Sequence, residues 1–309
     1  MLNQGATDTD IRRVVHDKYA LIPGTDVQND GSSARVAEAF GYTASELAQI
    51  PEGSNLGLSC GNPTAMANLR EGETVVDLGS GGGLDVFLAA RKVGPTGKAI
   101  GIDMTMAMIA LARRNASKAG LLNAEFFLGE IEHMPLRDNT ADCVISNCVI
   151  NLCPNKDTAL QEIYRIVKPG GRLAISDIVL KKELPEEIAH DVYAYVGCVA
   201  GAIQTDIYKT KLEAAGFKGM SNVLVVDSHA DLSVYSDVDC CSGASKGCGT
   251  ASASRETPQD SDSTCCGPVQ SSKGEETEEL RLKMSGFMKN YPINDYLASV
   301  KIFATKPLV

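Results

Sequence analysis

The chain of 309 residues contains no tryptophan, and aromatic side chains make up only 5% of it. Such a sequence offers no platform of aromatic rings on which nucleic-acid bases could stack. It also lacks any run of lysines and arginines, and its net charge is −10. A nucleic acid or an anionic membrane would require a basic patch, so we expect neither as a partner.

Long apolar runs and targeting signals are missing as well. No stretch reaches the roughly 18 uninterrupted apolar residues that a membrane span needs, and the N-terminus lacks the basic start and apolar core of a secretory signal. We therefore expect a cytoplasmic protein whose ten cysteines are reactive or ligating rather than joined in disulfides. No Cys-x-x-Cys pair occurs, which argues against a structural zinc site.

From residue 72 onward the sequence alternates regularly between strand and helix patterns. Apolar runs predict strands at 74–78, 98–103, 124–128, 141–147 and 172–177, and helical periodicity appears at 84–93, 105–119 and 155–167. This alternation indicates a Rossmann-like α/β fold, a doubly wound and mostly parallel sheet with helices on both faces. A strand near 223–226 follows, and the last run, at 299–305, is expected to close the sheet as an antiparallel strand.

Composition divides the chain into four parts, 1–71, 72–227, 228–298 and 299–309. The first is an N-terminal region of helices and loops that begins with a helix over 8–19. The second is the core, which ends with helices at 185–201 and 204–215. The third is interpreted as a flexible insertion, because 239–278 are crowded with Ser, Gly, Thr and Glu and have too few large apolar residues to fold alone. The fourth supplies the closing strand.

A glycine-rich loop, Asp77-Leu78-Gly79-Ser80-Gly81-Gly82-Gly83, follows the first predicted strand. A strand, a glycine turn and a helix in this order bring backbone N–H groups close to a nucleotide. The spacing Gly-x-Gly-x-Gly differs from the fingerprint of NAD enzymes. Asp103 ends the second strand, where its carboxylate can accept both hydroxyls of a ribose. The alternative for the loop by itself is a flexible turn without a ligand.

This combination resembles the S-adenosylmethionine-dependent methyltransferases of the Rossmann-like class. The resemblance implies that the loop faces the methionine end of the cofactor and that Asp103 holds the ribose. It places the residues after the third strand against adenine and the end of the fourth strand at the transfer site. The cofactor-binding residues that it implies are Asp77, Gly79, Ser80, Gly81, Asp103, Met104, Glu130, Ile131 and Asn147.

Three cysteines stand in separate local contexts around this core. Cys60 lies in a loop bounded by glycine and proline, Cys148 directly follows the fourth strand, and Cys198 lies in the helical region after the fifth. Ligands of doubly wound sheets bind beyond the carboxyl ends of the strands, so Cys148 and Cys198 should lie at that edge. The Cys60 loop is expected to fold over them freely, as a lid. Three widely separated thiols fit a three-coordinate, pyramidal acceptor better than tetrahedral zinc.

The other cysteines carry weaker signals. Cys143, inside a predicted strand, is interpreted as a small buried hydrophobic residue. Cys153 stays open between an incidental and an auxiliary role. Five more cysteines belong either to a thiol arm that captures or passes on a thiophilic element, or to a linker that contains them incidentally: Cys240, Cys241, Cys248, Cys265 and Cys266.

Motifs along residues 55 to about 220 resemble the arsenite methyltransferases. They are Cys-Gly-Asn-Pro at 60–63, the glycine loop at 77–83, Gly-Ile-Asp-Met-Thr at 101–105, Gly-Glu-Ile-Glu at 129–132, Ser-Asn-Cys-Val-Ile-Asn-Leu at 146–152, Lys-Pro-Gly-Gly at 168–171 and Ile-Ser-Asp at 175–177. Asp-Met-Thr and Ser-Asn-Cys-Val-Ile-Asn-Leu are far more specific than the glycine loop.

This resemblance implies that Cys60, Cys148 and Cys198 are the catalytic residues and the ligands of trivalent arsenic. The arsenic lone pair would attack the methyl group of S-adenosylmethionine in line, so that no general base is required. Arsenite or methylarsenite is then the substrate, thioredoxin or glutathione the reductant, and arsenic detoxification the role. Many family members carry a further cysteine upstream, but none precedes Cys60 here, which leaves the choice between the two arsenicals open.

Two other functions remain as alternatives. One is the methylation of an organic small molecule such as a quinone or a sterol, with cysteines that are unrelated to the reaction. The other is a thiol-based metalloid binder that keeps the nucleotide-binding fold without enzymatic activity.

Overall fold

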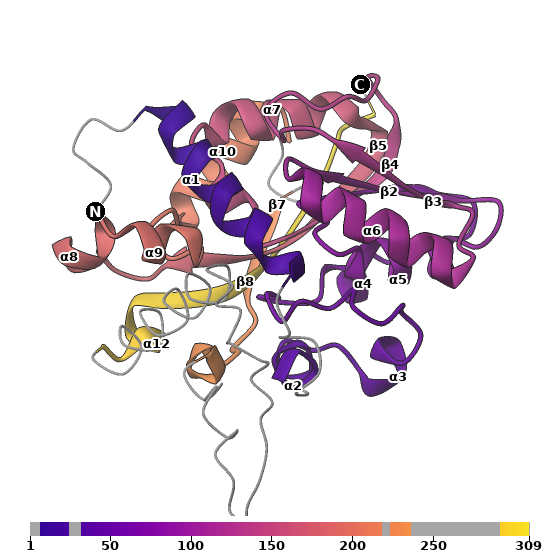
Figure 1. Cartoon of the computed structure of the whole chain (residues 1–309). Coiled ribbons are helices and arrows are strands. Elements are labelled where there is room, and N and C mark those ends of the chain that lie inside the picture. Colours follow the sequence, from indigo (N-terminus) through magenta and orange to yellow (C-terminus); the bar gives the residue numbers. More distant parts are fainter. Residues whose placement is uncertain (1–6, 25–31, 218–222, 236–290, 309) are drawn as a thin grey trace, which may run out of the picture.

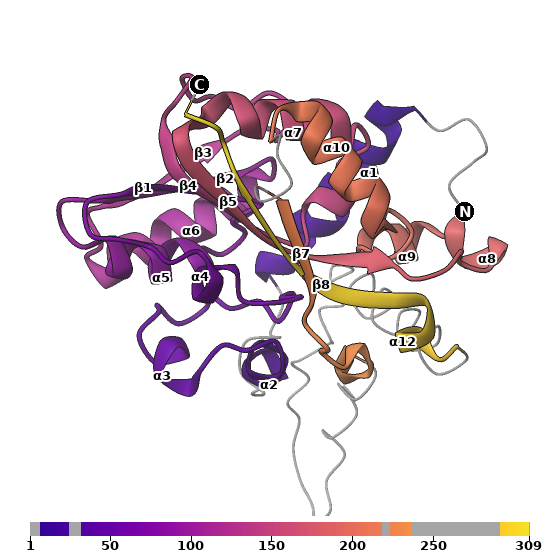
Figure 2. The same ribbon diagram turned by 180° about the vertical axis from the view of Figure 1, so that it is seen from behind.

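The computed structural model describes residues 7–24, 32–217, 223–235 and 291–308. Its centre is an eight-stranded sheet in the order β3-β2-β1-β4-β5-β8-β7, with the short β6 paired to β5 (Figure 1). The strands are β1 (Thr74–Leu78), β2 (Lys98–Asp103), β3 (Ala124–Leu128), β4 (Ala141–Asn147), β5 (Val167–Leu180), β6 (Ile203–Gln204), β7 (Val223–Asp227) and β8 (Leu297–Thr305). All pairings among β1 to β6 are parallel, and β8 runs antiparallel to both β5 and β7 (Figure 2).

Helices cover both faces of this sheet, which confirms the predicted Rossmann-like fold and its antiparallel closing strand. The α-helices are α1 (Asp8–Leu21), α2 (Ser32–Ala39), α3 (Ala44–Leu47), α4 (Pro63–Met66), α5 (Leu84–Val93), α6 (Met106–Ala119), α7 (Lys156–Ile166), α8 (Glu186–Ala189), α9 (Val192–Val196), α10 (Thr205–Ala215) and α12 (Ile293–Tyr296). Short 3₁₀ turns are η1 (Ile22–Gly24), η3 (Ile150–Leu152) and η4 (Leu232–Tyr235).

The parallel strands are apolar throughout because each buries its two faces against different helices. Val76 and Val144 pack with α7 and α10. Their neighbours Val75 and Cys143 point the other way and pack with α4, α5 and α6. The expectation that Cys143 is a buried hydrophobic residue is therefore confirmed, since its side chain is fully enclosed in this layer.

The order of the strands determines where a ligand can bind. The chain proceeds outward from β1 to β2 and β3 on one side, and then continues with β4 and β5 on the other. This reversal opens a crevice at the carboxyl ends of β1 and β4, the usual ligand site of doubly wound sheets. Helix α1 lies over that edge, where it contacts α6 and α9 (Figure 1).

The predicted helix over 185–201 is wrong. The structure has two short helices there, α8 and α9, because the Asp191 side chain accepts hydrogen bonds from the backbone N–H groups of Tyr193 and Ala194 and begins a new helix. After Val196 the chain turns instead of continuing the helix, and Cys198 adopts a positive φ of 63°. The Cys198 thiol thus lies on a turn.

Smaller differences concern the ends of elements. Strand β5 begins at Val167 rather than 172, so Pro169 lies within it, beside an irregular register with β4. Strand β8 begins at Leu297, and Leu232, Ile293 and Leu297 are buried, so both described ends of 228–298 pack on the core. The Cys-rich segment 239–278 lies outside the described residues. Where the chain is described, no helix is long and apolar enough to cross a membrane.

An ion pair fixes the N-terminal region to the sheet. The Arg172 guanidinium on β5 donates to both carboxylate oxygens of Glu73, at 2.7 and 2.6 Å, and to the carbonyl of Asn68, at 2.9 Å. The two charged side chains are only 14% and 13% exposed. Removing one partner would leave the other charge in a poorly solvated position.

We predict that Arg172→Met lowers the free energy of unfolding by about 2–3 kcal/mol, because it leaves the Glu73 carboxylate half-buried without its cation. The matched control is Lys98→Met, whose partner Glu125 is as exposed as the lysine, and it should cost at most about 1 kcal/mol. Urea denaturation monitored by circular dichroism gives both values. Equal losses in the two variants would contradict the assigned role of Arg172.

Candidate active site

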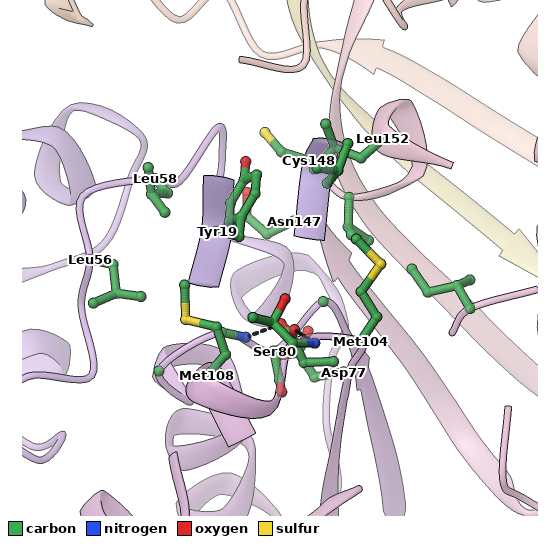
Figure 3. Close-up of a pocket in the computed structure, with 18 of the residues that line it drawn as sticks. Tyr19, Leu56, Leu58, Asp77, Ser80, Met104, Met108, Asn147, Cys148 and Leu152 are labelled. Atoms are coloured by element: carbon green, nitrogen blue, oxygen red, sulfur yellow. Dashed lines mark hydrogen bonds between the residues drawn. The ribbon is translucent and has the colours of Figure 1, made fainter. Parts of the chain in front are cut away.

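A pocket occupies the crevice at the carboxyl edge of the sheet. Its walls come from the loop after β1, the segments after β2, β3 and β4, and the N-terminal helix α1. Figure 3 shows Asp77, Ser80 and Met108 at the lower end of this pocket, and Cys148 and Leu152 at its upper end. One cavity therefore connects the glycine loop to two of the three predicted cysteines, Cys148 and Cys198.

The glycine loop forms the lower wall, and its close packing requires glycine. Gly79 has a φ of +67°, and a Cβ atom there would lie 2.5 Å from Cγ2 of Val149. Gly81 donates its N–H to Oδ2 of Asp103 at 3.0 Å. Ser80 also lines the pocket, and its buried hydroxyl lies against β2, where a Cβ atom on Gly101 would be 2.6 Å from Oγ. This hydroxyl has no hydrogen-bond partner among the residues that the structure describes.

Asp103 lies at the end of β2 and binds the loops on either side of it. Its Oδ1 accepts from the N–H of Thr105 at 2.8 Å, and its Oδ2 accepts from Gly81. Each oxygen keeps lone-pair capacity for a ligand hydroxyl. Burial raises the pKa of Asp103, and the two N–H donors oppose that shift.

Three further carboxyl groups line the same pocket, those of Asp77, Asp85 and Glu132, and all three are buried. Glu132 is paired with Arg12, which also lines the pocket, at 3.3 Å. Burial raises the pKa of Asp77 well above its ordinary value, and the neighbouring carboxyl groups of Asp85 and Asp103 add to the shift. Burial also raises the pKa of Asp85 to about 6, while hydrogen bonds from Tyr42 and Asn147 oppose it. The three acidic groups without a cationic partner in this lining favour a ligand that carries positive charge.

Most of the predicted cofactor-binding residues meet in this pocket, and one does not. The lining includes Asp77, Gly79, Ser80, Gly81, Asp103, Met104, Ile131 and Asn147. Glu130 is absent from it: its side chain is 47% exposed, and its Oε2 lies 3.5 Å from Nε of Arg12. Sequence reasoning missed the contributions of Arg12, Val15 and Tyr19, because α1 lies far from the core in sequence and carries no motif.

The three predicted cysteines come together. Cys60 and Cys148 form a disulfide, with Cα atoms 5.9 Å apart, and the Cys198 thiol donates to the Cys148 carbonyl at 3.1 Å. The prediction that these cysteines carry no disulfide is therefore wrong for one pair. Two sulfurs close enough to share one soft ligand are also close enough to be oxidised together. With that disulfide closed, no group of three or more His, Cys, Asp or Glu within the described ranges could hold a metal ion.

The Cys60 loop is not the free lid that its glycine and proline suggested. The Cys60 N–H donates to Oδ1 of Asn147 at 2.9 Å, and the Cys60 carbonyl accepts from the Ser299 hydroxyl at 2.7 Å. Gly61 lies so close to β5 that a Cβ atom there would be 2.6 Å from Cβ of Ser176. The Cys60 loop is thus attached to β4, β5 and β8.

The backbone at two of these cysteines is unusual. Cys148 and Cys198 both have φ values of +63°, in the left-handed backbone region that residues other than glycine rarely adopt. A cysteine that only filled space would gain nothing from this conformation. Backbone strain of this kind is concentrated at functional sites, where the surrounding structure enforces it.

The electrostatic surroundings keep the Cys198 thiol protonated. Burial raises its pKa, the Asp177 carboxyl raises it further, and the Lys156 ammonium opposes the shift. Cys153 lines the same pocket, and its pKa is also raised, mainly by burial. These thiols are therefore unreactive at neutral pH until a ligand displaces their protons.

Comparison with known proteins agrees with this geometry. Residues 69–216 match the family described as a methyltransferase domain. The crystal structure of CrArsM, an arsenic(III) S-adenosylmethionine methyltransferase from Chlamydomonas reinhardtii, superposes with a TM-score of 0.50 at 30% identity, and covers 66% of this chain and 68% of that one. The chain belongs to the arsenite methyltransferase family.

Curated relatives extend this result. The arsenite methyltransferase of Halobacterium salinarum is 45% identical over 225 residues, which is 68% of this chain and 58% of that protein. The ubiquinone/menaquinone C-methyltransferase UbiE of Escherichia coli is 33% identical over 130 residues, 42% of this chain and 52% of its own. This chain thus spans somewhat more than half the length of these two curated relatives.

The buried acid Asp85 provides a test of the electrostatics. Its pKa of about 6 exceeds the roughly 3.9 of an unfolded chain, so between these values the folded state binds more protons. The free energy of unfolding contributed by this group therefore falls as the pH rises from about 4 to about 6, and does not recover above that range. We predict that Asp85→Asn loses less stability between about pH 4.5 and pH 7.5 than the wild type.

Urea denaturation of the ligand-free protein at the two pH values measures this difference. Asp206→Asn makes the same change in net charge at an exposed position and should follow the wild type. If Asp85→Asn shows the same dependence on pH as the wild type, Asp85 does not titrate in the way that we describe.

Proposed function

We propose that this protein transfers a methyl group from S-adenosylmethionine to trivalent arsenic held by the sulfurs of Cys60, Cys148 and Cys198, and so serves in arsenic detoxification. The observation that carries the proposal is the meeting of three cysteines from distant segments: Cys148 and Cys198 line the pocket that also contains the glycine loop and Asp103, and Cys60 is joined to Cys148. The names of the Chlamydomonas and Halobacterium proteins support the same reaction.

The lower wall of the pocket fits S-adenosylmethionine. The Asp103 oxygens have capacity for the two ribose hydroxyls. Asp77 lines the same wall, where a bound ammonium group would favour the ionised carboxylate and so oppose the raised pKa of Asp77. When bound, the cofactor supplies an electrophilic methyl group on a positively charged sulfonium. We assign its binding to Asp77, Gly79, Ser80, Gly81, Asp103, Met104, Ile131 and Asn147; the contact of Glu130 with adenine stays a prediction.

The chain's own residues bind and orient the substrate. In the reduced protein, three thiols and arsenous acid give one arsenic–trithiolate and three waters, so that the raised thiol pKa is no obstacle to binding. The arsenic keeps its lone pair, which makes a general base unnecessary, and no histidine among the described residues lines the pocket. The contribution of the protein is then mainly positioning, which is worth up to roughly 7–11 kcal/mol of barrier.

The disulfide supports a role for a reductant. Two electrons and two protons must convert the Cys60–Cys148 disulfide to thiols before all three sulfurs can bind arsenic. We propose thioredoxin or glutathione as the source and the cytoplasm, where both are available, as the location. The choice between arsenite and methylarsenite and the use of the cysteines in 239–278 stay open.

The decisive experiment incubates reduced protein with arsenite, S-adenosylmethionine and thioredoxin or glutathione, and separates the arsenic species formed. We predict methylated arsenic from the wild type and a loss of at least about 100-fold with Cys148→Ser, because one ligand of the acceptor is missing. Cys143→Ser, a buried thiol outside the pocket, is the matched control and should stay active.

The same assay separates the alternatives. A methyltransferase of an organic acceptor would turn over a quinone and tolerate Cys148→Ser. A non-enzymatic binder would retain arsenic without consuming S-adenosylmethionine. Formation of no methylated arsenic from either arsenite or methylarsenite would refute the proposal.

The residues assigned to cofactor binding lead to a second prediction. Asp103→Ala should raise the Kd for S-adenosylmethionine by at least about 10- to 100-fold, because the loss of even one hydrogen bond to a charged group costs about 1.5–3 kcal/mol. Isothermal titration calorimetry measures this change, with the exposed Asp206→Ala as the control. Arsenic binding by the reduced variant should not change. An unaltered Kd would remove Asp103 from the cofactor site.

A further inference from the structure

Two asparagines flank Cys148 in the segment Asn147-Cys148-Val149-Ile150-Asn151, and each contacts a different remote cysteine segment. The Asn147 amide binds the Cys60 segment from both ends: its Oδ1 accepts from the N–H of Cys60 at 2.9 Å, and its Nδ2 donates to the Gly61 carbonyl at 2.8 Å. A side-chain amide with both ends bonded to one backbone segment fixes its position and orientation. Asn147 thus determines where Cys60 lies relative to Cys148.

Asn151 makes the corresponding contacts to the third cysteine segment. Its Nδ2 donates to the Cys198 carbonyl at 3.3 Å and to the Ile178 carbonyl at 2.7 Å. The side chain therefore connects the Cys198 turn to the end of β5. Because η3 places Asn151 one turn after Cys148, this short segment carries the Cys148 sulfur together with both asparagine amides. Those amides bind the backbone of the Cys60 and Cys198 segments.

The Asn147 amide is itself held by two buried side chains, Tyr42 and Asp85. Its Nδ2 donates to the Tyr42 hydroxyl at 3.0 Å, and that hydroxyl donates to Asp85 at 2.8 Å. Tyr42 and Asp85 are 2% and 5% exposed, and they come from the N-terminal region and from α5. A chain of hydrogen bonds in a poorly solvated interior leaves the amide a single orientation.

The hydrogen bonding of Asn151 argues against a purely stabilising role. The residue is fully buried, yet its Oδ1 has no partner among the described residues. A buried polar atom without a partner costs about 1–3 kcal/mol. An apolar residue of similar size would avoid that cost, but it would leave the Cys198 carbonyl without its donor.

We propose that Asn147 and Asn151 are positioning residues that set the three-sulfur geometry, Asn147 for Cys60 and Asn151 for Cys198. Tyr42 and Asp85 act behind Asn147 by fixing its amide. This inference rests on the proposed function, because it assigns roles within the arsenic site. It predicts that substitution of each asparagine releases a different sulfur from arsenic. A general loss of protein stability would not produce that pattern.

The test counts arsenic ligands and identifies the cysteine that is lost. All variants are made in a full-length background in which Cys240, Cys241, Cys248, Cys265 and Cys266 are serine, so that only the cysteines between 60 and 198 can bind arsenic. Reduced protein is loaded with arsenite without a methyl donor. X-ray absorption then gives the number of sulfurs on arsenic, and alkylation with iodoacetamide followed by mass spectrometry shows which cysteines are unprotected.

We expect three sulfurs in the parent protein and two in each asparagine variant. In Asn147→Ala the newly alkylated cysteine should be Cys60, and in Asn151→Ala it should be Cys198. Methylation turnover should fall by about 100-fold in both, as expected for a displacement of about 1 Å at the reacting centre. The KM for S-adenosylmethionine should stay within about threefold in Asn151→Ala.

The matched control is Asn123→Ala. Asn123 also donates Nδ2 to two backbone carbonyls, those of Ala90 and Gly94, both at 2.9 Å, but it precedes β3 at the far side of the sheet. It should keep three sulfurs and normal turnover at a comparable loss of thermal stability. Three sulfurs in both test variants, or release of the same cysteine from both, would overturn the proposal.

Two further outcomes are separable. If Asn147→Ala does not fold, Tyr42→Phe decides, since it removes only the hydroxyl behind Asn147: release of Cys60 supports the proposal, and retention of three sulfurs overturns it. If Asn151→Ala does not fold, Asn151→Asp decides, since it replaces the Nδ2 donor to the Cys198 carbonyl by an oxygen: release of Cys198 supports the proposal, and retention of three sulfurs overturns it. If the parent protein binds arsenic through three sulfurs but never methylates it, the proposed function fails and the positioning roles stand. If it methylates arsenic without the predicted release pattern, only the positioning roles fail.

Discussion

The site depends on the hydrogen bonds between the Asn147 amide and the backbone of Cys60 and Gly61. They join a loop that precedes the first strand to the end of the fourth, 87 residues later in the sequence. They hold the Cys60 backbone directly beside Cys148, the residue that follows Asn147. The tight fit of Gly61 against Ser176 and the bond from Ser299 then fix the remaining freedom of the loop.

The topology of the sheet explains why this junction also meets the glycine loop. Parallel strands end at one edge, and the reversal between β1 and β4 leaves that edge open. The carboxyl groups of Asp77, Asp85 and Asp103 collect there, and Asp85 and Asp103 add to the raised pKa of Asp77, so the pocket gains free energy from a cationic ligand. Uncharged sulfur ligands lie at the other end. The pocket therefore separates a site for a positive charge from a site for a soft atom.

The sequence was sufficient for the parts of the structure that local pattern controls. The alternation of apolar runs predicted the parallel strands, and Cys148 was placed correctly because it directly follows β4. The prediction of one helix over 185–201 was wrong because Asp191 caps the start of a new helix there. Such a cap depends on a single side chain, so helical periodicity in the sequence does not reveal it. The fixed Cys60 loop and the cover by α1 could not be predicted, since both depend on contacts between distant segments. The sequence contains the Asn-Cys-Val-Ile-Asn segment as a motif, but it does not show what the two asparagine amides do. Their proposed role depends on hydrogen bonds to the backbone of Cys60, Gly61 and Cys198, which are distant in sequence.

The disulfide and the proposed arsenic site use the same sulfurs, so they exclude each other. A geometry that brings Cys60 and Cys148 near enough to share one arsenic atom also permits their oxidation, and no rearrangement of the Asn147 amide is needed for either state. Arsenic bound as a trithiolate protects the pair from oxidation, whereas a closed disulfide leaves Cys198 without its two partner ligands. If the proposed site binds arsenic through all three sulfurs, the supply of reducing equivalents controls how much of the protein can accept substrate. The reductant in the proposed function follows from this exclusion, because the disulfide and the arsenic ligands are the same sulfurs.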